Sequence, residues 1–186
     1  MHFLQTPEYE VGLSSEEHSD KVLCFDEAGA CAPLDVGYRY RFTSRQDDSW
    51  TGRFAQGMVN YSDVLATPSP RHCCIVMLGQ AYLVDVAHPD RTLPLPHPHV
   101  VGHVGGPASS ALVLVTFTEL IGIRSDGTWW VSERLASDEI RNVTIDGDVV
   151  RGEGWIAATD TWTPFTLDAE SGRIIAERIH DSLETG

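Results

Sequence analysis

Short segments of strand-forming residues separated by tight-turn residues fill the chain from residue 73 onward, and three of the turns recur at a regular interval. Asp85, Asp126 and Asp168 each stand at or near a turn between two such segments, and they are 41 and 42 residues apart. A period of about 40–50 residues is long enough for about four short strands and their connections. The interval therefore predicts an all-β chain built from antiparallel meanders of about four strands.

The segments between these turns have the composition of strands. They are rich in β-branched and aromatic residues, and Asp-Gly dipeptides divide several of them. Glycine tolerates the positive φ that a tight hairpin turn requires, so Asp-Gly between apolar runs indicates a hairpin. Helix is expected only as single turns at 62–66 and 137–141, each opened by a capping serine. The expected strands are 73–78, 81–87, 91–95, 111–117, 119–125, 128–135, 140–145, 149–156, 163–169 and 173–179.

The last of these hairpins, TPFTLDAESGRIIAE at 163–177, carries a family resemblance. It resembles the outer hairpin of pyrroloquinoline-quinone-type and related β-propeller repeats, in which an Asp and a Gly frame the turn. Ile174, Ile175 and Ala176 stand where such repeats usually have a tryptophan. The resemblance implies blade geometry over about residues 73–179. No quinone-binding residue can be matched, so it implies no quinone, and no cofactor is expected.

The blade-like units would span about 73–95, 99–135 and 140–179 of a single all-β domain, 1–186, with residues 1–72 less regular. A fourth unit could include the apolar segments 20–25 and 35–42, although 43–72 breaks the rhythm. A small closed propeller and a stack of sheets therefore both remain open. Alternation along the strands predicts a core of Ile75, Met77, Leu83, Val113, Val115, Ile121, Ile123, Val143, Ile145, Trp155, Phe165, Leu167 and Ile174.

The charge balance restricts the class of partner. Thirteen Lys and Arg against 27 Asp and Glu give a net charge of −14. A field of this sign repels phosphate backbones and attracts basic surfaces, so we expect a basic protein as the partner and no nucleic acid. The N-terminus lacks the basic and apolar regions of a signal peptide, and no apolar run approaches a membrane span. These features predict a cytoplasmic protein that does not bind membranes.

The predicted cytoplasmic location determines the redox state that we expect for the four cysteines. Cys24 and Cys31 flank an expected turn and could meet across a hairpin, but free thiols are expected in a reducing cytosol. Cys73 and Cys74 are adjacent. Neighbours in a strand point to opposite faces, so this pair is not expected to form an ordinary disulfide.

Three histidines, His97, His99 and His103, lie close together in RTLPLPHPHVVGHVGG, residues 91–106. On an extended strand His97 and His103 would be about 20 Å apart, which is too far for one zinc ion. His97 and His99 could chelate a metal together if His72, His88 or Cys73 supplied a third ligand. The alternating prolines remove ladder donors, however. We therefore expect a connector between two meanders, continuing through Gly102, Gly105, Gly106 and Pro107, and no bound metal.

No nucleophile elbow, phosphate loop, metalloprotease motif or dinucleotide fingerprint occurs in the sequence. The acidic segment 146–154 lacks the ligand spacing of a calcium loop and is expected to be a hairpin tip. Trp129 and Trp130 are adjacent in an expected strand, so one should be buried and the other exposed.

Two other tryptophans suggest a recognition face. Trp50 and Trp162 lie in loop-like segments beside Asp47, Asp48 and Asp160, which would combine apolar anchors with a charged rim. These five residues are the predicted binding site. The predicted function is a non-enzymatic protein-binding module of the inhibitor or immunity type. The alternatives are a metal-dependent enzyme that uses His97, His99 and His103, and a carbohydrate-binding module that uses the tryptophans.

Overall fold

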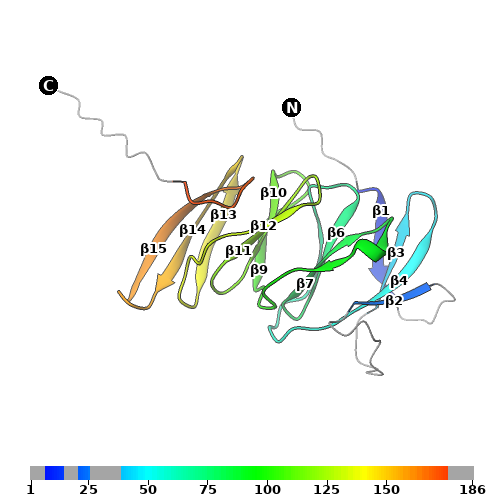
Figure 1. The fold of residues 1–186 in the computed structure, drawn as a ribbon, viewed down its shortest axis with the longest axis horizontal. Helices are drawn as coiled ribbons and strands as arrows, with labels where there is room; N and C mark the ends of the chain where they lie inside the picture. Colours follow the sequence, from blue (N-terminus) through cyan, green and yellow to red (C-terminus); the bar gives the residue numbers. More distant parts are fainter. Residues whose placement is uncertain (1–6, 15–20, 26–38, 176–186) are drawn as a thin grey trace.

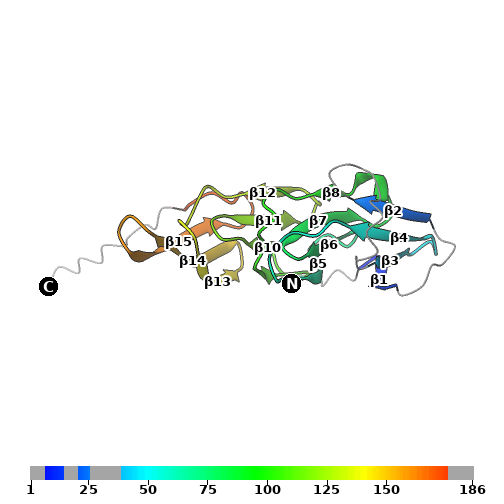
Figure 2. The same ribbon diagram turned by 90° about the horizontal axis from the view of Figure 1, so that it is seen from below.

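The computed structural model describes residues 7–14, 21–25 and 39–175, and the fold of this part is all-β. Four sheets lie side by side along the long axis of the molecule (Figures 1 and 2). Sheet A contains β1 (Tyr9–Leu13), β2 (Lys21–Phe25), β3 (Arg39–Ser44) and β4 (Ser49–Phe54). Sheet B contains β5 (Asp63–Ala66), β6 (His72–Met77), β7 (Gln80–Asp85) and β8 (Leu93–Pro94). Sheet C contains β9 (Gly102–Gly105), β10 (Ala111–Val115), β11 (Leu120–Arg124) and β12 (Trp129–Val131), and sheet D contains β13 (Ile140–Asp146), β14 (Val149–Ile156) and β15 (Thr161–Asp168).

Three of the sheets are meanders in chain order. Sheets B, C and D pair each strand with the next in antiparallel fashion, and sheet D adds one bridge between Leu167 and Ile174. Sheet A has the order β1-β3-β4-β2, in which β2 runs parallel to β4. The prediction of repeated antiparallel sheets is confirmed. Of the two architectures that the sequence leaves open, the described sheets form a propeller-like row and not a closed ring (Figures 1 and 2).

Burial on both faces explains why the central strands are apolar throughout. Cys73, Ile75 and Met77 on β6 pack toward sheet A, whereas Cys74 and Val76 pack toward sheet C. The two cysteines are free thiols and face different cores, as expected. A strand between two neighbouring sheets has no solvent face, so its sequence is continuously apolar and does not alternate with polar residues.

The regular aspartates have a common structural role. Asp85 ends β7, Asp126 lies in the turn between β11 and β12, and Asp168 ends β15. Each carboxylate accepts a backbone N–H from the turn that follows: that of His88 for Asp85, Thr128 for Asp126 and Ser171 for Asp168. A short acidic side chain that bonds its own turn is a local alternative to ladder pairing. The interval of 41 and 42 residues therefore marks the exit from the third strand of sheets B, C and D.

Several local expectations are wrong, and they concern elements whose pairing is decided by distant residues. The segment 62–66, expected as a helical turn, contains strand β5, and 137–141 leads into β13 without a helical turn. The irregular region 43–72 contains β4, and Gly102 and Gly105 belong to β9, not to the connector. Neighbouring strands supply the hydrogen bonds in each case, which overrides weak local preference. Residues 35–38 and 176–179 of the expected strands lie outside the described residues.

Most of the predicted core is buried, with four exceptions. Val143, Ile145 and Trp155 are half-buried, and Ile174 is 49% exposed. All four lie in sheet D or its edge, which has a described neighbour on one face only. The expectation that Ile174 is a core residue is wrong.

Cys24 is disulfide-bonded, which contradicts the expectation of a free thiol, and Cys31 lies outside the described residues. Disulfides are typical of oxidising compartments, so this bond adds no support to the predicted cytoplasmic location. The single helix of the described part is the three-residue 3-10 turn η1 (Pro89–Arg91), so no described helix could cross a membrane.

Candidate functional site

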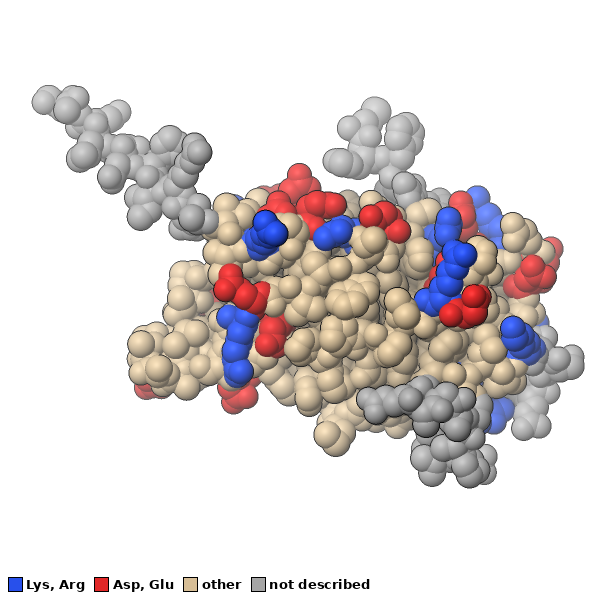
Figure 3. All heavy atoms as spheres, viewed as in Figure 1, with Lys and Arg blue, Asp and Glu red and all other residues tan. Residues whose placement is uncertain are grey.

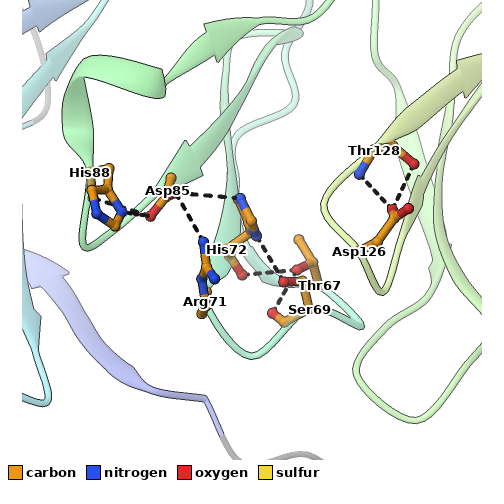
Figure 4. Close-up of polar contacts among 8 residues, drawn as sticks. All are labelled: Thr67, Ser69, Arg71, His72, Asp85, His88, Asp126 and Thr128. Carbon is orange, nitrogen blue, oxygen red and sulfur yellow. Dashed lines mark hydrogen bonds and ion pairs between the residues drawn. The ribbon is translucent and has the colours of Figure 1, made fainter.

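A cluster of ionisable side chains surrounds Asp85 at the end of β7 (Figure 4). The buried carboxylate of Asp85 lies 3.6 Å from a guanidinium nitrogen of Arg71, 3.9 Å from Nε2 of His72 and 3.4 Å from Nδ1 of His88. The Ser69 hydroxyl is 2.8 Å from Nδ1 of His72. The serine therefore lies next to the histidine, and the histidine next to the aspartate, which is the order of these side chains in the catalytic triad of hydrolases.

The burial and spacing of this group favour a structural role. Ser69 is 4% exposed, so a substrate cannot reach its hydroxyl. The 3.9 Å between His72 and Asp85 exceeds hydrogen-bond distance. Burial lowers the pKa of His72, and its ring packs against Gly127 of sheet C, where an added Cβ would lie 2.5 Å from the ring. The cluster joins sheet B to sheet C.

The three histidines of the predicted connector have different partners. His103 is on β9, and its Nδ1 lies 2.7 Å from the hydroxyl of Tyr61. His97 lies 3.9 Å from the carboxylate of Glu119, and His99 packs against Phe117. Among the described residues no group of three or more His, Cys, Asp or Glu side chains is arranged to hold a metal ion. The connector itself is confirmed as the link between β8 and β9, although His97 has a left-handed φ of 64° and is not extended.

His97 and His99 line a cleft of about 1000 Å³. Its walls come from three sheets: Phe25 of sheet A, Gln80 and Tyr82 of sheet B, and Trp129 of sheet C, together with the β4–β5 connector and the proline connector, residues 95–101. Figure 2 shows β2, β8 and β12 along one side of the row, where these walls lie. The walls are mainly apolar, as is usual for binding pockets.

Exposed apolar side chains gather around this cleft. Met58 and Trp129 line it and are 90% and 37% exposed. Phe117, 40% exposed, contacts the lining residue His99. A concentration of this kind on a charged protein indicates an interaction site.

The cleft has no charged wall in the described part of the chain. None of its lining residues is Asp, Glu, Lys or Arg. Figure 3, which looks onto this side, shows a broad area without charged side chains in the centre, with both acidic and basic side chains around its margin. We call this area the uncharged face. If the charged side chains behind the net charge of −14 were spread evenly over the surface, this area would carry some of them.

The structure separates the residues of the predicted recognition face. Trp50 lies on β4, is 5% exposed, stacks on Phe42 and donates its indole N–H to the Val86 carbonyl. The expectation that Trp50 is an exposed loop residue is wrong, because its strand packs against sheet B. Asp47 and Asp48 are exposed in the β3–β4 turn of sheet A, whereas Asp160 is exposed in the β14–β15 turn of sheet D. Two sheets lie between these turns (Figure 1).

Trp162 lies on the outer face of sheet D. It pairs across the strands with Trp155, and their ring centroids are 5.5 Å apart. The guanidinium of Arg141 lies 3.7 Å from the Trp162 ring centroid and also donates to Glu153. Hydrogen bonds from Arg141 and Asn142 lower the pKa of Glu153. One face of the Trp162 ring is thus already covered within the chain. Trp129 and Trp130 divide as predicted, with Trp130 buried and Trp129 exposed at the cleft.

Sequence reasoning found the histidines of the cleft and missed its other walls. Met58 and Trp129 are 71 residues apart in the chain, and only the stacking of sheets brings both to one cleft. The available signal was the unbroken run of neutral residues from 92 to 118, apart from histidine, in an otherwise acidic sequence.

Neither a protein-family model nor a curated protein sequence matches this chain significantly. Solved structures match it at a distance. Hydrazine synthase of Kuenenia stuttgartiensis is 12% identical with a TM-score of 0.40, and the match covers 84% of this chain and 48% of that chain. The N-terminal domain of Nup159 is 11% identical with a TM-score of 0.38, over 92% of this chain and 44% of that chain. Glutaminyl cyclase of Myxococcus xanthus is 13% identical with a TM-score of 0.31, over 84% of this chain and 68% of that chain. This chain spans about half the length of the first two, and its fold is established by the strand pairings above.

Proposed function

We propose that this protein is a non-enzymatic module that recognises another protein, and that the partner docks on the uncharged face with the cleft at its centre. The observation that carries the proposal is the gathering of Met58, Phe117 and Trp129 around a cleft with no charged wall. The module would be of the inhibitor or immunity type, and the charge balance favours a basic protein as its partner.

The arrangement fits known protein interfaces, in which apolar and charged side chains make different contributions to binding. Large exposed apolar side chains at the centre supply affinity, because they exclude water when a partner covers them. Acidic groups around them attract a basic surface and speed encounter without entering the apolar centre. The uncharged face would be such a centre (Figure 3), and the net charge of −14 would attract a basic surface.

We also propose that the four sheets are related to blades of the quinone-type propeller repeat. The turn at Asp126 supports this relation, because Gly127 follows it and the buried Trp130 comes three residues later. The closing hairpin has Ile174 and Ile175 after its turn instead of a tryptophan. The relation concerns architecture and implies no cofactor.

Photo-crosslinking from inside the cleft tests the protein-binding function. A benzoylphenylalanine placed at Met58 should form a discrete protein adduct in extracts of the source cells, because the side chain is 90% exposed at the cleft. The same group at Ile174, which is 49% exposed on sheet D, is the matched control and should give no adduct. With the purified partner, Trp129→Ser should weaken binding by about tenfold or more.

Equal adducts from both positions, or an affinity that Trp129→Ser leaves unchanged, would remove the uncharged face as the docking site. A partner that carries no basic patch would leave the docking site in place and overturn the charge argument.

A further inference from the structure

The wall of the cleft is held in place before any ligand binds. The proline connector is fixed to sheet B through the Leu95 N–H, which donates to the Ala81 carbonyl, and the Val100 N–H, which donates to the Gly79 carbonyl. The side-chain amide of Gln80 donates to the Leu95 carbonyl. Prolines restrict the backbone further. A wall that does not need to be ordered on binding reduces the entropic cost of binding.

The cleft combines a rigid wall with adaptable contacts. Tyr82 in the wall is fixed by a hydrogen bond from its hydroxyl to the Ala55 carbonyl. Met58, on the β4–β5 connector, is almost fully exposed, and methionine side chains adapt to ligands of different shape. Such a cleft is suited to apolar side chains presented by a short peptide segment.

Negative charge stands next to the cleft and not in it. The carboxylate of Glu119 lies 3.9 Å from His97, which lines the cleft. Both acidic and basic side chains lie around the uncharged face (Figure 3), while the chain as a whole carries −14. Cationic groups beside an apolar segment would therefore meet opposite charge, whereas anionic groups would be repelled.

We infer that the cleft binds a short cationic amphipathic segment of a partner protein, with apolar side chains against Met58 and Trp129 and an Arg or Lys side chain directed to Glu119 beside the cleft. This inference rests on the proposed protein-binding function and names the chemistry of the segment that docks. The occupant is a peptide segment of another protein, whose flanking positive charges are opposite in sign to Glu119 and to the net charge of the chain.

Three hexapeptides with blocked ends test the inference on the full chain. Gly-Arg-Leu-Phe-Arg-Gly has both features, Gly-Arg-Ser-Ser-Arg-Gly keeps only the charge, and Gly-Glu-Leu-Phe-Glu-Gly keeps only the apolar pair. Titration followed by amide NMR should show the first peptide shifting cleft residues such as Gln80, His97 and His99. The other two should bind about tenfold more weakly or not measurably, since each lacks one of the two contributions.

Variants locate the site and separate the two contributions. Met58→Ser and Trp129→Ser should each weaken the first peptide by about tenfold, while Ile174→Ser, an exposed apolar residue of sheet D, should not. Glu119→Gln should weaken it about two- to fivefold and reduce its salt dependence. Asp146→Asn, exposed on the β13–β14 hairpin, is the matched control for removal of one negative charge.

Equal binding of all three peptides, shifts confined to residues outside the cleft, or Met58→Ser and Trp129→Ser with unchanged affinity would each overturn the inference. If the peptides do not bind but a protein still crosslinks from position 58 and depends on Trp129, the proposed function stands and the peptide class is wrong. If neither the peptides nor a protein bind, both fail.

Discussion

The indole N–H of Trp130 in sheet C donates a 2.9 Å hydrogen bond to the carbonyl of Ala169 in the turn that follows sheet D's last strand. Trp50 of sheet A makes the equivalent bond to the Val86 carbonyl, just after β7 of sheet B. Val86 and Ala169 each follow one of the regular aspartates, Asp85 and Asp168. Between sheets B and C, the residue after Asp126 is Gly127, and His72 packs against it. In each case, a side chain of the preceding sheet therefore contacts the residue that follows the aspartate.

Trp130→Phe should lower the free energy of unfolding by about 1–3 kcal/mol, because the buried Ala169 carbonyl loses its donor while most of the ring remains. Denaturant unfolding measures the change. Trp129→Phe removes an indole N–H from the exposed neighbour and should change stability by less than about 0.5 kcal/mol. Equal losses in the two variants would show that the hydrogen bond to Ala169 does not join the sheets.

Gly172→Ala should be more damaging than an ordinary surface substitution. Gly172 has a φ of 69°, and a Cβ there would lie 2.3 Å from the Trp130 ring. We expect a loss of about 2–4 kcal/mol, from the left-handed backbone and from displacement of the ring. Gly147→Ala, with a φ of 56° and no atom within 4 Å of the added Cβ, isolates the backbone contribution. A loss no larger than that of Gly147→Ala would show that the ring does not pack on Gly172.

Thr92→Val should stabilise the protein. The Thr92 hydroxyl is buried and has no hydrogen-bond partner among the described residues, so valine removes an unsatisfied polar group and keeps the shape. The expected gain is about 1 kcal/mol, seen as a higher melting temperature. Thr116→Val is the matched control, because the buried Thr116 hydroxyl donates to the Glu119 carbonyl and accepts the Glu119 N–H. That variant should be destabilised, and a destabilised Thr92→Val would mean that its hydroxyl is satisfied in solution.

The fold was predictable where a local signal and the long-range arrangement agree. Asp126 and Gly127 form a turn in any context, and the interval between the aspartates reflects their common place at the end of a third strand. Trp50 was not predictable in this way. Its neighbours Asp47 and Asp48 indicate a turn, but the side chain is buried because sheet B lies against β4, and that contact involves residues 23–36 positions further along the chain.

The candidate site was predictable only in part for a related reason. The prolines beside His97 and His99 correctly predicted a connector, since proline cannot donate in a ladder. The cleft exists because Phe25, Tyr82 and Trp129 come to the same side of three different sheets. Periodicity within one segment carries no information about which side of a distant sheet an edge strand will occupy.

Cys73 and Cys74 should resist alkylation in the folded protein. Both are fully buried, and burial raises the pKa of each thiol, that of Cys74 to about 12, which leaves little thiolate at neutral pH. Mass spectrometry after iodoacetamide treatment at pH 8 should find both unmodified, and both modified in denaturant. Labelling of either thiol at the rate of a free cysteine would show that sheet B opens from one of its neighbours.

The free energy of unfolding should decrease as the pH is lowered, because of the titration of His72. Burial lowers the pKa of His72 below its ordinary 6.5, although the Asp85 carboxylate opposes this shift and Arg71 adds to it. Both states are neutral above pH 6.5, so the neutral ring contributes fully there. As the pH falls below 6.5 the unfolded chain takes up a proton that the folded protein does not, and the free energy of unfolding decreases until the folded pKa is passed.

Denaturant unfolding between pH 7.5 and 5.5 gives the slope of the free energy of unfolding against pH. Comparing this slope between wild type and a His72 variant separates the effect of His72 from that of the carboxylates. His72→Gln should lower stability at every pH, because the contact with Ser69 changes, and should reduce the slope, because the titrating group is gone. His88→Gln is the matched control, because it removes another ring that faces Asp85 but leaves the contact between His72 and Gly127 in place. An unchanged slope in His72→Gln would mean that the His72 ring is exposed to water in solution. The contact between His72 and Gly127, which joins sheets B and C at the turn after Asp126, would then not be maintained.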